Sequence, residues 1–134
     1  VALKLLVKET GICFTPMVLE SMAYPFISCS LDGFSDDRKV IAEIKCPNKD
    51  THEMAVNGSI PVYYNIQIQH QLFVSGAEYC LYFSYRPEDK IRPTALVRIE
   101  RNTILMKEIL EKEIDIWHRL IRGDLPIPII IRKS

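Results

Sequence analysis

Two acidic residues and a lysine lie close together between positions 32 and 45. Asp32 precedes a glycine, and Glu43 and Lys45 are two positions apart in an apolar run. On a strand this spacing places Glu43 and Lys45 on one face and Ile44 on the other. Two neighbouring carboxylates repel each other, and a divalent cation relieves that repulsion. A lysine beside the cation could act on an attacking water or on charge that builds on a phosphate. The pattern therefore suits metal-assisted hydrolysis of a phosphodiester.

The same residues also allow a purely structural interpretation. Glu-x-Lys on a strand is common and usually marks a solvated face, and Asp-Gly is more often a turn than a site. The residues on either side, Val40–Ala42 and Cys46-Pro47, are apolar. Charged groups inside an apolar central strand need partners, which favours a functional role.

The elements that must position these residues follow from hydrophobic periodicity and from turn residues. Residues 32–38 are dense in turn formers, so the strands on either side are expected to form a hairpin with Asp32 at a strand end. Asp50 is expected to cap the second helix, and Asn102 or Thr103 the last. We expect helices over residues 1–10, 51–56, 61–74 and 103–122, strands over 12–20, 26–31, 39–46, 78–85 and 94–99, and an extended tail over 124–134. This order predicts an α/β or α+β fold, with a mixed central β-sheet flanked by helices.

Composition is typical of one globular domain. The chain has 134 residues, 48% of them apolar and 25% charged, with a formal net charge of zero. Its longest apolar stretches are too short for a transmembrane helix, and neutrality argues against a broad, basic nucleic-acid binder. The four cysteines form no CxxC pair and have no histidine at zinc spacing. Free, mostly buried thiols in a reducing compartment are expected, which favours a cytoplasmic protein without a membrane partner.

Three motifs in register connect the chain to a known family. They are Ser30-Leu-Asp32-Gly33, Glu43-Ile-Lys45-Cys46-Pro47 and Tyr64-Asn-Ile-Gln67-Ile-Gln69. Together they resemble the PD-(D/E)xK nucleases, and most closely the lambda-exonuclease or YqaJ-like viral recombinase branch. The resemblance runs from about Ala2 to Arg101, and it implies a restriction-endonuclease-like core.

The resemblance also implies roles for individual residues. Asp32 and Glu43 would bind a catalytic Mg²⁺, which Mn²⁺ can replace, with the backbone carbonyl of Ile44 as a further ligand. Lys45 would act on the attacking water or on the transition-state charge, and Gln67 would orient Lys45 or the water. Family members add a helix glutamate, whose place is expected just before Val1. Residues 1–134 are therefore expected to be a single nuclease core domain that lacks its N-terminal part.

The implied function is a metal-dependent deoxyribonuclease, a 5′-3′ exonuclease on double-stranded DNA in phage-type recombination. Such enzymes often form ring-shaped homotrimers and work with a single-strand annealing protein in the bacterial cytoplasm, encoded by a phage or prophage. Two alternatives stay open: a related endonuclease, and a degenerate nuclease core that acts as a DNA-binding or assembly module. The cation would supply positive charge that the residue count omits, so neutrality does not contradict this function.

The remaining candidates have weaker support. Gln67 and Gln71 share a helical face with Tyr64, and His70 is near them. Helical spacing alone favours a hydrogen-bonded patch there over a site. The family resemblance reverses this preference for Gln67 only, and a site role for Gln69, Gln71 and His70 stays open as the less favoured alternative. Cys46 is expected to be a packing residue, and Trp117 and His118 are expected to pack or to contact another subunit.

Overall fold

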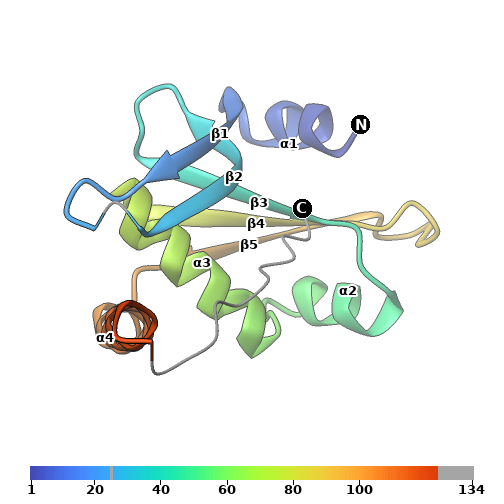
Figure 1. Ribbon diagram of the computed structural model, residues 1–134. Coiled ribbons are helices and arrows are strands. Elements are labelled where there is room, and N and C mark those ends of the chain that lie inside the picture. The colour runs from blue at the N-terminus through green and yellow to red at the C-terminus, as the bar shows by residue number, and fades with distance from the viewer. Residues whose placement is uncertain (25, 124–134) are drawn as a thin grey trace.

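The sheet runs through the middle of the molecule, and its strands lie side by side in the order of the chain. The structure is a computed structural model that describes residues 1–24 and 26–123 (Figure 1). The strands are β1 Phe14–Glu20, β2 Ser28–Ser35, β3 Val40–Lys45, β4 Tyr79–Tyr85 and β5 Thr94–Glu100. Neighbours pair antiparallel except β3 and β4, which are parallel. The predicted mixed central sheet is therefore confirmed.

Helices cover both faces of this sheet. The helices are α1 Ala2–Thr10, α2 Lys49–Val56, α3 Val62–Ser75 and α4 Thr103–Ile121. Figure 1 shows α1 on one face, and α3 on the other with α4 beside it. Two parallel strands cannot be joined by a tight turn, so the connection between β3 and β4 is long and contains α2 and α3. This crossover places α3 across β2, β3 and β4, on the face of the sheet opposite α1.

Two hydrophobic cores result, one on each face. The α3 face buries residues that include Leu31, Ile41, Ile68, Leu72 and Tyr82. The α1 face buries Leu6, Phe14, Val40, Ala42, Leu81 and Phe83, with Ile44 packed against them. Side chains alternate along a strand, so Glu43 and Lys45 share the α3 side with Ile41, while Ile44 faces α1. The predicted separation of Ile44 from its two charged neighbours is thus confirmed.

One turn lies elsewhere than expected. The sequence predicts that Asp32 ends a strand and that Gly33 begins a turn, but β2 continues to Ser35 and the turn occupies residues 36–39. Gly33 is needed here for close approach, because a Cβ on it would lie 2.6 Å from Phe14 Cβ. Asp32 is consequently held inside a strand.

Smaller corrections concern a helix cap and the cysteines. Asn48, and not Asp50, caps α2, because its side chain accepts a hydrogen bond from the Thr51 backbone N–H at 3.0 Å. Among the four free cysteines only Cys80 is buried, so the expectation of mostly buried thiols was wrong. Cys46 is exposed because it lies just beyond the end of β3, and it is not the packing residue that was expected.

The helix that follows β5 begins as predicted. The Asn102 side chain accepts a hydrogen bond from the Leu105 backbone N–H at 3.0 Å and so caps α4. The tail predicted over residues 124–134 lies outside the described residues. Among the described residues, no helix is both long enough and apolar enough to span a bilayer.

Candidate active site

The candidate site begins with an ion pair on β3. Glu43 is only 4% exposed, although it is charged. Lys45 Nζ lies 3.1 Å from Glu43 Oε1, and the lysine side chain is a quarter exposed. The pair lies at the carboxyl end of β3, where the sheet meets solvent. Glu43 is therefore a buried carboxylate with a partly solvated cation beside it.

Asp32 reaches the same place from the neighbouring strand. Gly33 pairs with Ala42 across β2 and β3, so the residue before Gly33 faces the residue after Ala42. The Ile44 backbone N–H donates a hydrogen bond to Asp32 Oδ2 at 2.8 Å. Asp32 is exposed, unlike Glu43. The hairpin thus brings the two predicted metal-binding carboxylates together.

Gln67 closes the site from α3. Its Nε2 donates to Glu43 Oε1 at 3.4 Å, and its Oε1 accepts from Lys45 Nζ at 3.5 Å. Both contacts are long, but they place Gln67 between the two charged groups. The structure therefore brings Asp32, Glu43, Lys45 and Gln67 into one cluster around Glu43.

Two further residues of α3 join this cluster without an assigned role from the sequence. Gln71 Nε2 donates to Glu43 Oε2 at 2.9 Å, which is the shortest hydrogen bond that Glu43 accepts in the cluster. The Tyr64 ring lies under the lysine, with Lys45 Nζ 4.6 Å from the ring centroid. The signal for both was their helical spacing from Gln67, which places all three on one face of α3.

The other polar residues of this helix serve the fold. Gln69 Nε2 donates to the Glu100 carbonyl at 2.9 Å, and its Oε1 accepts from the Asn102 N–H at 2.8 Å. Gln69 therefore secures the junction between β5 and α4. His70 Nε2 lies 2.9 Å from Glu113 Oε1 on α4, away from Glu43. Trp117 stacks on Phe26 with ring centroids 4.7 Å apart, which supports the packing role expected for it.

The surroundings of Glu43 disfavour the ionised form of its side chain. Burial raises the pKa of Glu43 above its ordinary value, and the nearby charge of Asp32 raises it further. The hydrogen bond from Gln71 and the charge of Lys45 lower this pKa, but they offset only part of the rise. The ionised form of Glu43 is thus disfavoured, first by burial and then by the charge of Asp32.

A hard divalent cation fits this donor set. Mg²⁺ prefers oxygen ligands, keeps several waters and is commonly held by one or two carboxylates. Asp32, Glu43 and the backbone carbonyl of Ile44 supply oxygen only. No group of three or more His, Cys, Asp or Glu side chains within residues 1–24 and 26–123 could hold a metal. Asp32 and Glu43 could supply two carboxylate ligands to such an ion, and its other positions would fall to backbone oxygen and water.

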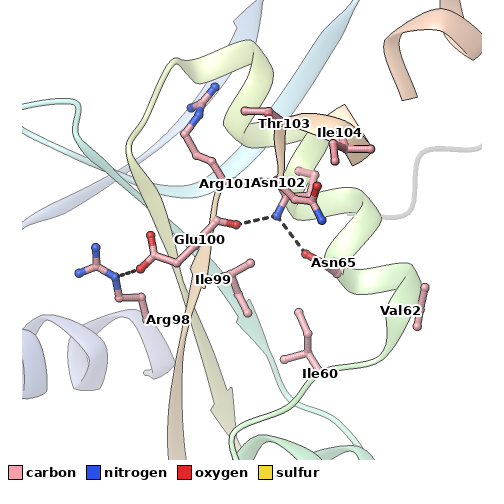
Figure 2. Close-up of a pocket in the computed structure, with 11 residues that line it drawn as sticks. Ile60, Val62, Asn65, Arg98, Ile99, Glu100, Arg101, Asn102, Thr103 and Ile104 are labelled. Carbon is pink, nitrogen blue, oxygen red and sulfur yellow. Dashed lines mark hydrogen bonds and ion pairs between the residues drawn. The ribbon is translucent and has the colours of Figure 1, made fainter. Parts of the chain in front are cut away.

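A hollow of about 530 Å³ lies elsewhere, between the start of α3 and the junction of β5 with α4 (Figure 2). Its polar lining is already paired within the protein: Asn65 accepts from Gln69, and Arg98 pairs with Glu100. Of the residues with a possible site role, only Gln69 lines it, and Asp32, Glu43, Lys45 and Gln67 do not. We therefore place the candidate site at Glu43 and not in this hollow.

A family sequence model and several solved structures match this chain. The sequence model of the family described as YqaJ-like viral recombinase domain matches residues 5–78, more than half of the chain. No curated protein matches the chain. Among solved structures, the chain is similar to an alkaline exonuclease, LHK-Exo, from Laribacter hongkongensis. The TM-score is 0.71 at 29% identity, over 92% of this chain and 70% of that one.

The same exonuclease has been solved in complex with dAMP, with the same similarity to this chain. A phage-related exonuclease from Haemophilus somnus 129PT shares the fold, with a TM-score of 0.61 at 19% identity over 82% of this chain and 61% of that one. The family match and the likeness to LHK-Exo support a nuclease function.

Proposed function

Because the chain belongs to the YqaJ-like viral recombinase domain family, we propose that it is a metal-dependent deoxyribonuclease. It hydrolyses DNA phosphodiester bonds at the cluster around Glu43. In this proposal Asp32, Glu43 and the Ile44 carbonyl hold Mg²⁺, or Mn²⁺ in its place. Lys45 and Gln67 act on the water and on the phosphate.

The observation that carries the proposal is the meeting of Asp32 and Glu43 beside Lys45. A buried carboxylate whose pKa is raised by burial and by a second carboxylate is costly to the fold. Such perturbed groups gather at functional sites more often than elsewhere. The cluster also combines the chemical groups that phosphodiester hydrolysis needs, namely oxygen ligands, an ammonium and amides.

The roles of the residues follow from their contacts. Glu43 receives hydrogen bonds or ion pairs at both oxygens, which fixes the plane of its carboxylate. Lys45 is partly exposed, so its ammonium can reach a phosphate and stabilise the negative charge that develops during hydrolysis. Gln67 restrains the lysine and can orient a water with its amide. When bound, Mg²⁺ would polarise the phosphate and acidify a water molecule.

The first experiment tests for nuclease activity and for its metal requirement. A linear, end-labelled DNA duplex is incubated with the protein in Mg²⁺, in Mn²⁺ or in EDTA. We expect cleavage with either metal and none in EDTA. If the wild-type protein binds metal and DNA but never cuts, the chain is a DNA-binding or assembly module and not an enzyme.

The second experiment tests the direction and the need for an end. We propose that the substrate is duplex DNA and that digestion proceeds from 5′ to 3′, as in the exonucleases that the motifs resemble. Labels at the two ends of one strand then disappear at different times, and a covalently closed circle resists digestion. Cleavage of the closed circle would instead identify an endonuclease.

The wider assembly also belongs to this proposal. We propose a ring-shaped homotrimer that encloses the duplex, acting with a single-strand annealing protein in the cytoplasm of a phage-infected or lysogenic bacterium. Sedimentation of the purified protein measures the subunit number, and a mass that fits a monomer at working concentration would contradict the ring.

A further inference from the structure

Beside the site, β2 and β3 are not paired with each other, and this unpaired stretch is called the opening below. On one side β2 pairs with β1 along most of its length, from Ser28 to Ser35. On the other side, its paired positions with β3 are only Gly33 with Ala42 and Phe34 with Ile41. The strands therefore separate towards the end of β3 that carries Glu43 and Lys45. Backbone groups facing this opening need partners other than the opposite strand.

Two side chains occupy this opening. Asp32 accepts the Ile44 N–H at 2.8 Å, as described above. Gln71 Nε2 donates to the Ser30 carbonyl on β2 at 3.0 Å and to Glu43 Oε2 at 2.9 Å. A single amide group from α3 thus connects the strand that carries Asp32 to the carboxylate on the next strand.

The orientation of the Gln71 amide is determined by its surroundings. Both neighbours of its nitrogen are acceptors, so an oxygen in that place would meet two other oxygens. Gln71 is 2% exposed, and its Oε1 has no hydrogen-bond partner among the described residues. An unpaired buried acceptor costs free energy. A leucine would fill this place without that cost, so the contacts of the nitrogen are the distinctive contribution of this residue.

We propose that Gln71 is the positioning residue that sets the separation of β2 and β3 at the site, and with it the separation of the Asp32 and Glu43 carboxylates. It touches neither metal nor substrate. The consequence for metal binding rests on the proposed function, whereas the link between the strands does not. The three motifs that reveal the family end at Gln69, so none of them includes this residue.

Gln69 provides a matched control. It lies two residues away on the same helix and is equally buried, at 1%. It also makes several hydrogen bonds, but they go to Asn65, Glu100 and Asn102, away from Glu43. Gln69→Leu therefore tests the general cost of removing a buried amide from α3. Gln71→Leu tests the same loss and, in addition, the link between β2 and β3.

The first measurement is hydrogen exchange of the Ile44 amide, followed by NMR in the metal-free protein. The Ala42 amide, which lies two residues earlier on the same side of β3 and in the part paired with β2, is the internal reference. Gln71→Leu should remove protection at Ile44 relative to Ala42, because β2 and Asp32 can then move away from the end of β3. Gln69→Leu should leave this ratio unchanged, even if it lowers protection throughout the protein. An unchanged ratio in Gln71→Leu would overturn the proposal.

The second measurement is Mn²⁺ affinity, by isothermal titration of folded protein. Loss of a residue that orients a metal ligand typically weakens metal binding about 10- to 100-fold. We expect a loss of this size in Gln71→Leu and wild-type affinity in Gln69→Leu. Should Gln71→Leu fail to fold, Gln71→Met retains the length of the side chain without its donor and is measured in the same way.

The two hypotheses can fail separately. If the wild-type protein binds no Mn²⁺ or Mg²⁺ and cuts no DNA, the proposed function fails, while exchange at Ile44 still decides the role of Gln71. If the wild-type protein binds metal and cuts DNA but Gln71→Leu matches it in both affinity and exchange, the positioning role fails and the nuclease stands.

Discussion

The Asp32 carboxylate accepts a hydrogen bond from the backbone N–H of Ile44 at 2.8 Å, across the gap between two strands. This bond places an exposed carboxylate beside the residue that follows Glu43. A side chain held by the backbone of the neighbouring strand has little freedom to turn away. This hydrogen bond therefore directs Asp32 towards the site.

The first prediction separates the charge of Asp32 from its hydrogen bond. In Asp32→Asn the amide oxygen can still accept the Ile44 N–H, but one negative charge is lost. We expect unchanged folding by circular dichroism and a fall in DNA cleavage of about 100-fold or more, since charge stabilisation by a bound metal contributes several kcal/mol. Cleavage at the wild-type rate would show that Asp32 holds no catalytic ion.

The second prediction concerns Lys45. Lys45→Met retains much of the apolar stem but removes the ammonium that pairs with Glu43. We expect kcat to fall about 100- to 1000-fold, as with the loss of one group that stabilises a transition state. Lys49→Met is the control, because Lys49 is exposed at the start of α2 and the variant carries the same change in charge. Equal losses in the two variants would indicate a general effect of charge.

The third prediction follows from the raised pKa of Glu43. A carboxyl group with a raised pKa binds its proton more tightly in the folded protein than in the unfolded chain. Its contribution to stability is complete below the ordinary value of 4.5 and is lost as the pH rises through the raised value. Asp32→Asn removes one cause of the rise, so metal-free Asp32→Asn should lose less stability than wild type over this range.

Thermal melts in EDTA across this pH range measure the difference. Asp37 and Asp89, whose pKa values are lowered by hydrogen bonds, contribute in the opposite direction. They are unchanged in both proteins and cancel in the comparison. A difference in melting temperature between the two proteins that is the same at every pH would contradict the electrostatic coupling of Asp32 to Glu43.

The fourth prediction concerns the close approach of β1 and β2. In Gly33→Ala the new methyl group would lie 2.6 Å from Phe14 Cβ, so the two strands must move apart. Overpacking of this kind costs about 1–3 kcal/mol of unfolding free energy, to be measured by urea denaturation. Ser30→Ala, at an exposed position of the same strand, should change stability by less than about 0.5 kcal/mol.

The fifth prediction concerns the buried His52 of α2. Its Nδ1 lies 2.7 Å from Ser84 Oγ on β4, and its Nε2 lies 2.7 Å from the Arg92 carbonyl. His52→Phe leaves both partners unsatisfied, and each costs about 1–3 kcal/mol of unfolding free energy. His70→Phe is the control, because pairing of its partly exposed ring with Glu113 contributes at most about 1 kcal/mol. Equal losses of unfolding free energy in the two variants would show that the two hydrogen bonds of His52 add no extra stability.

Much of the fold could be predicted from the sequence, because its signals are local. Gly11 and Gly76, both in the left-handed conformation, mark helix ends, and the alternation on β3 separates Ile44 from its charged neighbours. One exception is Gly33. Asp-Gly is a frequent turn, but the actual reason for this glycine is Phe14, nineteen positions earlier in the chain. Contacts of this kind have no local pattern.

The same distinction applies to the candidate site. Asp32, Glu43, Lys45 and Gln67 could be singled out because they belong to recurring motifs, and the structure brings them together. Gln71 has only helical spacing in its favour, which Gln67 and Tyr64 share. Its importance depends on the opening between β2 and β3, and an opening in a sheet becomes visible only when all three elements are in place.

The parallel pairing of β3 with β4 has a consequence for the order of folding. The hairpin that brings Asp32 to Glu43 involves residues near in sequence, so it closes rapidly. The amides of Gln67 and Gln71 reach Glu43 across 24 and 28 positions, and only after the crossover has docked α3. Contacts between residues distant in sequence form slowly. We therefore expect the two carboxylates to meet early and to remain in water until the helix covers Glu43, the step at which the ionised side chain loses its hydration.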